Sequence, residues 1–206
     1  DLYESYVGSI LSACSLGVIA FNKIESVDRV NAVVIPMILA AIGVLASILG
    51  SLLVKTGEST DQMTLLKALR RGTNTSALII AVIAFPIVWF VLGKDFIGFY
   101  FAILGGLLAG VLIGFFTEYF TSDTYKPTQN LAAKSETGSA TLIIGGLGLG
   151  MLSTAVPIII IAICVMAAYA FSGGFIETTR GLYGIALAAV GMLSTLGITL
   201  ATDAYG

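Results

Sequence analysis

The chain has 206 residues, of which 57% are hydrophobic and only 11% charged, and its mean hydropathy is +1.01. A soluble domain carries about 25% charged residues, so this composition excludes a water-facing globular surface and predicts an integral membrane protein. The formal net charge of −2 excludes a basic face for nucleic acid, and the absence of histidine excludes histidine-based catalysis and histidine-bound zinc within the chain.

Runs of about 20 mainly apolar residues predict six membrane-spanning helices. We expect these spans at residues 2–21, 32–54, 73–92, 96–120, 139–171 and 181–203. Three spans contain a proline, at Pro36, Pro86 and Pro157, and in lipid such breaks persist only where neighbouring groups satisfy the freed carbonyls. The pattern predicts an all-α, polytopic transmembrane helix bundle that forms a single domain over residues 1–206. Because the sequence starts at Asp1 and stops within a span, we expect an internal piece of a larger protein.

The connections at 55–72 and 121–138 are longer than the other three and, with six spans, lie on one side of the membrane. Six of the ten basic residues fall on that side, so the positive-inside rule predicts that the long loops are cytoplasmic. In the first long loop, Ser59 and Gln62 have capping-box spacing, which predicts a short interfacial helix ahead of the third span.

Small residues recur every four positions in three of the spans, the first of which contains Ser5, Ser9, Ala13 and Gly17. The fourth contains Gly106, Gly110 and Gly114, and the fifth contains Gly146 and Gly150. Such spacing lets helix backbones approach closely, which is how membrane helices associate without a hydrophobic driving force. We expect tight helix packing there, with a hinge or a pore lining as the alternative.

Ionisable residues stand at the start of the first span, where a charge is costly unless it has a function. Asp1 and Glu4 are three residues apart and Ser5 follows, so the three share one helix face. Two carboxylates and a hydroxyl offer oxygen ligands to a monovalent cation, or a proton site. The alternative is that both acids simply lie among lipid headgroups.

Asp203 near the end of the last span shares a stripe with Thr195 and Thr199, which predicts a polar face pointing into the bundle. The residues alone predict a multi-span, ion-linked transporter or pump. A channel or a purely structural membrane subunit is the alternative class.

Four strings of the sequence resemble one family, the membrane-bound, ion-pumping pyrophosphatases. They are DLYESYVGSI, RGTNTSALII, YKPTQNLAAKSETGSATLIIGGLGLGM and ATDAYG, and they follow one another in order through the whole chain. That family folds as two concentric rings of helices and works as a homodimer. The resemblance implies that this piece runs from the sixth to the eleventh helix, with the first and last spans in the inner ring.

The resemblance implies a primary pump, a multi-pass protein of a prokaryotic cell membrane, that couples hydrolysis of pyrophosphate to outward ion transport. Its cofactors are magnesium and the transported ion, and potassium dependence is left open. The resemblance also implies contacts with membrane lipid and with a second copy of the protein. It places the catalytic residues and the magnesium ligands outside residues 1–206.

By the same resemblance, Asp1 is the gate aspartate, and Glu4 and Ser5 complete a sodium site. Proton-pumping members often hold the glutamate one turn further on, where this sequence has Gly8. Asp203 matches an aspartate that supports the hydrolytic site indirectly. The implied function is therefore a sodium pump. A proton-pumping pyrophosphatase, or a secondary ion transporter or channel with a carboxylate site, is the alternative.

Overall fold

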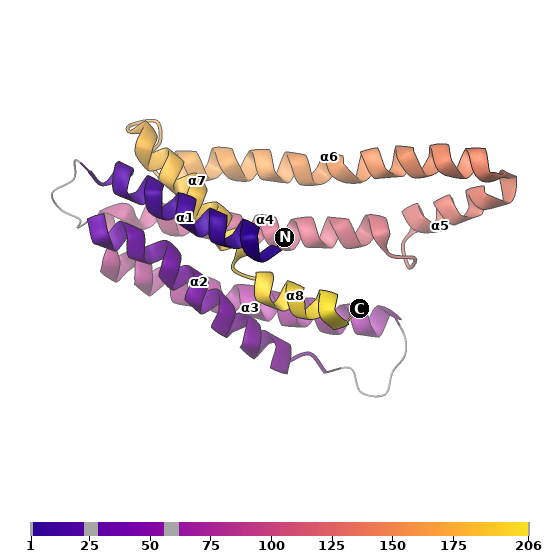
Figure 1. Ribbon diagram of the computed structural model, residues 1–206, viewed down its shortest axis with the longest axis horizontal. Helices are drawn as coiled ribbons and strands as arrows, with labels where there is room; N and C mark the ends of the chain where they lie inside the picture. Colours follow the sequence, from indigo (N-terminus) through magenta and orange to yellow (C-terminus); the bar gives the residue numbers. More distant parts are fainter. Residues whose placement is uncertain (1, 23–28, 56–61, 206) are drawn as a thin grey trace. The chain divides into compact units, whose positions relative to one another are not determined.

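A computed structural model describes residues 2–22, 29–55 and 62–205, and every regular element within them is helical. The elements are α1 Leu2–Ala20, α2 Arg29–Leu52, α3 Gln62–Val91, η1 Lys94–Phe96, α4 Ile97–Thr121, α5 Lys126–Ala133, η2 Lys134–Thr137, α6 Ser139–Phe171, α7 Thr178–Leu193 and α8 Leu196–Tyr205 (Figure 1). The expected all-α class is confirmed.

Five helical stretches of the described chain are long and apolar enough to cross a membrane. They are Val30–Leu52, Met63–Val91, Lys94–Thr137, Ser139–Phe171 and Thr178–Leu200. Helix α1, at 19 residues, is not among them. Glu4 and four serines interrupt its apolar sequence, and its crossing of the membrane stays a prediction, as does the arrangement of six spans in one domain.

The helix expected ahead of the third span is not a separate element. Helix α3 begins at Gln62 and runs for 30 residues to Val91 without a break. The predicted interfacial helix was therefore wrong as an independent unit, and it forms the first turns of α3. Further along α3, α2 packs closely against it, and a Cβ on Gly50 of α2 would lie 2.9 Å from the Gly72 carbonyl oxygen. Ser59, the expected cap, lies outside the described residues.

The last predicted span, 181–203, is divided into α7 and α8 at Ser194 and Thr195. The Ser194 hydroxyl donates to the Val190 carbonyl at 2.7 Å, and such back-bonding to the preceding turn bends helices. Helix α2 packs against the bend, where a Cβ on Gly43 would lie only 2.5 Å from the Ser194 carbonyl oxygen.

The polar stripe expected along this span lies only partly within the described side chains. Thr195 is buried, whereas Thr199 is exposed. The two residues are one helical turn apart, because the Thr199 N–H and hydroxyl each donate to the Thr195 carbonyl at 3.3 Å. The side chain of Asp203 lies outside the described residues, so a polar face pointing into the bundle stays a prediction.

The helices form two compact units, residues 1–110 with 164–206 and residues 111–163. In the first unit, α2 packs along α3, α1 packs on α2 and α7, and α8 lies against α2 and α3 (Figure 1). The second unit contains the last part of α4, all of α5 and η2, and the longer part of α6.

An aromatic cluster joins three helices of the first unit. Tyr183 of α7 lies with its ring centroid 5.1 Å from that of Phe99 in α4 and 5.7 Å from that of Phe21 after α1. All three side chains are fully or almost fully buried. Edge-to-face pairs of this kind add to the stabilisation from buried area, so the cluster fixes where α1 ends relative to α4 and α7.

The same tyrosine replaces a hydrogen bond that the proline in α2 cannot make. Pro36 has no backbone N–H, so the Ala32 carbonyl one turn earlier lacks its helical donor. The Tyr183 hydroxyl donates to that carbonyl at 2.7 Å. Gly17 of α1 leaves the space, since a Cβ there would lie 3.0 Å from the Ala32 oxygen. A neighbouring helix thus satisfies the carbonyl that the proline frees, which keeps α2 continuous.

Two reciprocal glycine contacts hold α4 against α7 within the first unit. A Cβ on Gly106 would collide with the carbonyl oxygen of Ala188, and one on Gly191 would lie 2.8 Å from that of Ile103. A Cβ on Gly110 would lie 3.2 Å from the side chain of Met192. The expected tight packing is confirmed for this pair of helices.

The remaining glycines predicted to pack in the fourth and fifth spans have open space beside them within this chain. A Cβ on Gly114, Gly146 or Gly150 would meet no atom within 4 Å. Helix α6 exposes large apolar side chains beside them, among them Met151 at 77%. These glycines therefore make no close helix contact within residues 111–163.

Candidate ion site on helix α1

Helix α1 is packed along its second half and open near its start. Ala13, Gly17 and Ala20 are buried against α2 and α7. Glu4 and Ser5, two turns or more nearer the start of the helix, are exposed. Consecutive side chains point about 100° apart around a helix, so Glu4 and Ser5 are neighbours around the helix and not members of one stripe. The described part of this chain leaves both predicted ion ligands open.

Tyr6 fixes the start of α1 against two other helices. Its hydroxyl donates a long hydrogen bond of 3.4 Å to the Ala40 carbonyl of α2 and also interacts with the Ser194 hydroxyl at the α7–α8 break. A half-buried tyrosine in an apolar span requires such partners for its O–H. Hydropathy alone gives no sign of this role of Tyr6, although Tyr6 stands beside the predicted ligand Ser5.

The structure leaves both Glu4 and Ser5 exposed near the start of α1, and their joining in one ion site stays a prediction. No atom lies within 4 Å of the space beside Gly8, one turn further along. The Ser9 hydroxyl donates to the Ser5 carbonyl at 2.8 Å, so that carbonyl is partly engaged within the helix. A carboxylate and a neighbouring hydroxyl supply oxygen ligands, but fewer than are needed to replace the hydration shell of a cation.

The structure does not describe the side chains of the other two predicted site residues. Asp1 lies outside the described residues, and Asp203 belongs to the end of α8, whose side chains also lie outside the described part. In the first unit, α1 begins and α8 ends toward the same end (Figure 1). The backbone therefore places these helix ends on one side, without bringing the acidic side chains together.

Acidic side chains do not gather elsewhere in the described ranges either. No group of three or more aspartate, glutamate or cysteine side chains there is arranged to hold a metal ion. Glu177 pairs with Arg180 at 2.7 Å, and the Arg180 guanidinium lies 5.4 Å from the centre of the Phe96 ring. This pair joins α7 to η1 and thus has a structural role.

Comparison with known proteins gives a family match over the whole chain. The family model described as "Inorganic H+ pyrophosphatase" matches residues 1–206. A protein of Bacteroides thetaiotaomicron is 49% identical over 209 residues and one of Clostridium tetani is 45% identical over 206. Both carry the name "Putative K(+)-stimulated pyrophosphate-energized sodium pump".

A third relative has a different transported ion in its name. A protein of Methanosarcina mazei, named "K(+)-insensitive pyrophosphate-energized proton pump", is 37% identical over 206 residues. Each match covers the whole chain but only 28% or 29% of the relative, so the chain spans less than a third of the length of these proteins. The chain belongs to the inorganic H+ pyrophosphatase family.

Proposed function

We propose that this chain is part of a primary pump that couples the hydrolysis of pyrophosphate to outward transport of sodium across a cell membrane. The observation that carries the proposal is the similarity along all 206 residues to two relatives named as pyrophosphate-energized sodium pumps. The resemblance assigns to this chain the ion gate at Asp1, Glu4 and Ser5. It assigns to Asp203 an indirect role, in which this residue supports the hydrolytic site.

The position of Glu4 supports sodium over the proton. Glu4 and Ser5 are consecutive, exposed residues of α1, and Gly8 stands where a glutamate one turn further on would be. Adjacent carboxylate and hydroxyl oxygens suit a hard cation whose hydration shell is partly removed. The relative named as a proton pump makes proton transport the second candidate.

The rest of the full-length protein supplies the catalytic groups in this proposal. In this proposal the magnesium ligands lie outside residues 1–206, and the described residues of this chain do not gather three acidic side chains. Magnesium, when bound to the remaining part, neutralises phosphate charge and activates water. We further propose that the long loops face the cytoplasm and that the protein works as a homodimer. We also propose that potassium stimulates it, because the names of the two sodium-pump relatives include that property.

Replacing Glu4 by alanine in the full-length protein tests the sodium site. We expect the sodium concentration for half-maximal hydrolysis to rise about tenfold or more, because a charged ligand is lost. The magnesium dependence should stay unchanged, and Glu4→Asp should retain part of the sodium response. Glu136→Ala, which removes an exposed carboxylate in η2, is the matched control. Equal sodium activation of Glu4→Ala and the control would contradict the assignment.

The transported ion is tested in inverted membrane vesicles with a proton conductor present. A sodium pump continues to accumulate sodium when pyrophosphate is added, because its transport does not depend on a proton gradient. Loss of accumulation on addition of the conductor would instead show that the proton is pumped and that sodium follows it. Glu4→Ala should reduce the conductor-resistant uptake, whereas Glu136→Ala should not.

A further inference from the structure

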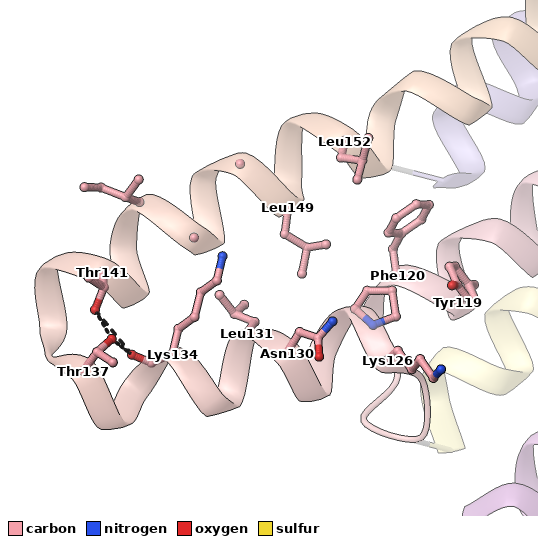
Figure 2. A pocket seen from close by; sticks show the side chains of 14 residues that line it. Tyr119, Phe120, Lys126, Asn130, Leu131, Lys134, Thr137, Thr141, Leu149 and Leu152 are labelled. Atoms are coloured by element: carbon pink, nitrogen blue, oxygen red, sulfur yellow. Dashed lines mark hydrogen bonds between the residues drawn. The ribbon is translucent and has the colours of Figure 1, made fainter.

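The second unit contains a groove that the proposed pump function does not use. It lies between the end of α4, the α5–η2 segment and the first half of α6, and its volume is about 820 Å³. Figure 2 shows Leu149 pointing from α6 toward α5, while Leu131 and Lys134 reach in the opposite direction. The volume is within the range of sites that hold small organic molecules.

The groove combines an apolar floor with a cationic edge. Leu131, Leu149 and Phe120 line its middle, while two lysines, Lys126 and Lys134, line its rim. None of the lining residues is acidic. The lining therefore favours a ligand with one anionic group and an adjoining apolar part.

Lys134 is exposed, and its side chain extends from η2 toward α6 (Figure 2). A Cβ on Gly145 would lie 2.9 Å from Cδ and 3.3 Å from Nζ of Lys134, so the lack of a side chain at Gly145 leaves room for the lysine there. The Thr137 hydroxyl donates to the Lys134 carbonyl at 2.7 Å, and the Thr137 and Thr141 hydroxyls lie 2.6 Å apart. These hydrogen bonds hold the backbone of η2 beside the start of α6.

We propose that this groove binds one anionic phospholipid, with the headgroup phosphate at Lys134 and an acyl chain along Leu131 and Leu149. Helix α6 has 33 residues, which at 1.5 Å per residue gives about 50 Å. Because the hydrocarbon core is about 30 Å thick, part of α6 extends into the headgroup layer. Basic pockets between helices at that level are suited to anionic headgroups.

The apolar surface of α6 continues from the groove toward the middle of the helix. Leu147 and Met151, beyond the lysine, are 66% and 77% exposed. Within the described residues of this chain, an acyl chain that leaves the groove would therefore meet further apolar surface. An acidic segment from the rest of the full-length protein would match the lysines but would not match the long apolar floor, so charge and shape together favour the lipid.

The test is native mass spectrometry of the purified full-length protein, titrated in detergent with phosphatidylglycerol or phosphatidylcholine. The protein should retain phosphatidylglycerol preferentially, and Lys134→Gln should bind it about fivefold more weakly, as expected for the loss of one lysine near an anionic headgroup. Gly145→Leu should reduce binding although it keeps every charge. Lys134→Arg should preserve binding, and Lys67→Gln, which alters an exposed lysine of α3, is the matched control.

Three results would overturn the proposal. The first is equal binding of phosphatidylglycerol by Lys134→Gln and Lys67→Gln, a comparison that stands even if Gly145→Leu does not fold. The second is displacement of the lipid effect by inorganic phosphate alone, which would assign the groove to a soluble anion. The third is a lower unfolding temperature of Lys134→Glu in lipid-free detergent with unchanged lipid binding, which would assign it to an acidic segment of the same protein.

Discussion

Replacing Gly106 by leucine is expected to prevent most of the full-length protein from accumulating in a folded form. A Cβ at this position would overlap the carbonyl oxygen of Ala188 and would lie 2.9 Å from its Cα. These are backbone atoms of α7, so no side-chain rotation relieves the collision. Overpacking in a rigid contact costs about 3 kcal/mol, and here the whole α4–α7 contact has to separate. Fluorescence-detected size-exclusion chromatography measures the folded fraction.

Neighbouring glycines of α4 provide graded controls for this variant. Gly105→Leu should be tolerated, because no atom of this chain lies within 4 Å of its Cβ position. Gly110→Leu should have an intermediate effect, because it meets the flexible side chain of Met192 as well as its carbonyl. Protein that survives should keep its sodium affinity. Equal folded yields for the Gly105 and Gly106 variants, or a selective change in sodium affinity, would contradict a packing role for Gly106.

Replacing Tyr183 by phenylalanine is expected to destabilise the protein by about 1–3 kcal/mol, because the substitution leaves a buried carbonyl without a donor. In the wild-type protein the Tyr183 hydroxyl donates to the Ala32 oxygen at 2.7 Å, and Tyr183 is 0% exposed. The need for this donor arises from Pro36, which cannot supply a backbone N–H to Ala32. The aromatic ring is retained in the variant, so the contacts with Phe21 and Phe99 persist.

A second substitution separates this explanation from a loss of packing. Pro36→Ala restores an N–H that can donate to the Ala32 carbonyl, so we expect it to recover much of the stability that Tyr183→Phe loses. Unfolding temperatures of the wild type, both single variants and the double variant form a double-mutant cycle. Additive effects in that cycle would contradict the role of Tyr183 as the replacement donor, because an interaction between the sites requires non-additivity.

Local features of the sequence determined the helical class and most of the helix positions. Long apolar runs are sufficient for this, because each helix satisfies its own backbone hydrogen bonds and needs no distant partner. The glycine spacing in α4 predicted a close helix contact, which the contact between Gly106 and Ala188 bears out.

Tertiary contacts decided the features that hydropathy does not encode. The division between α7 and α8 depends on the back-bonded Ser194 and on the approach of Gly43 from α2. The continuity of α2 through Pro36 depends on Tyr183, which is remote in sequence and is positioned only by the packing of α7. The placement of Lys134 beside Gly145 requires α5 and η2 to fold back along α6. Hydropathy describes one segment at a time, whereas each of these contacts joins two segments whose proximity exists only in the folded chain.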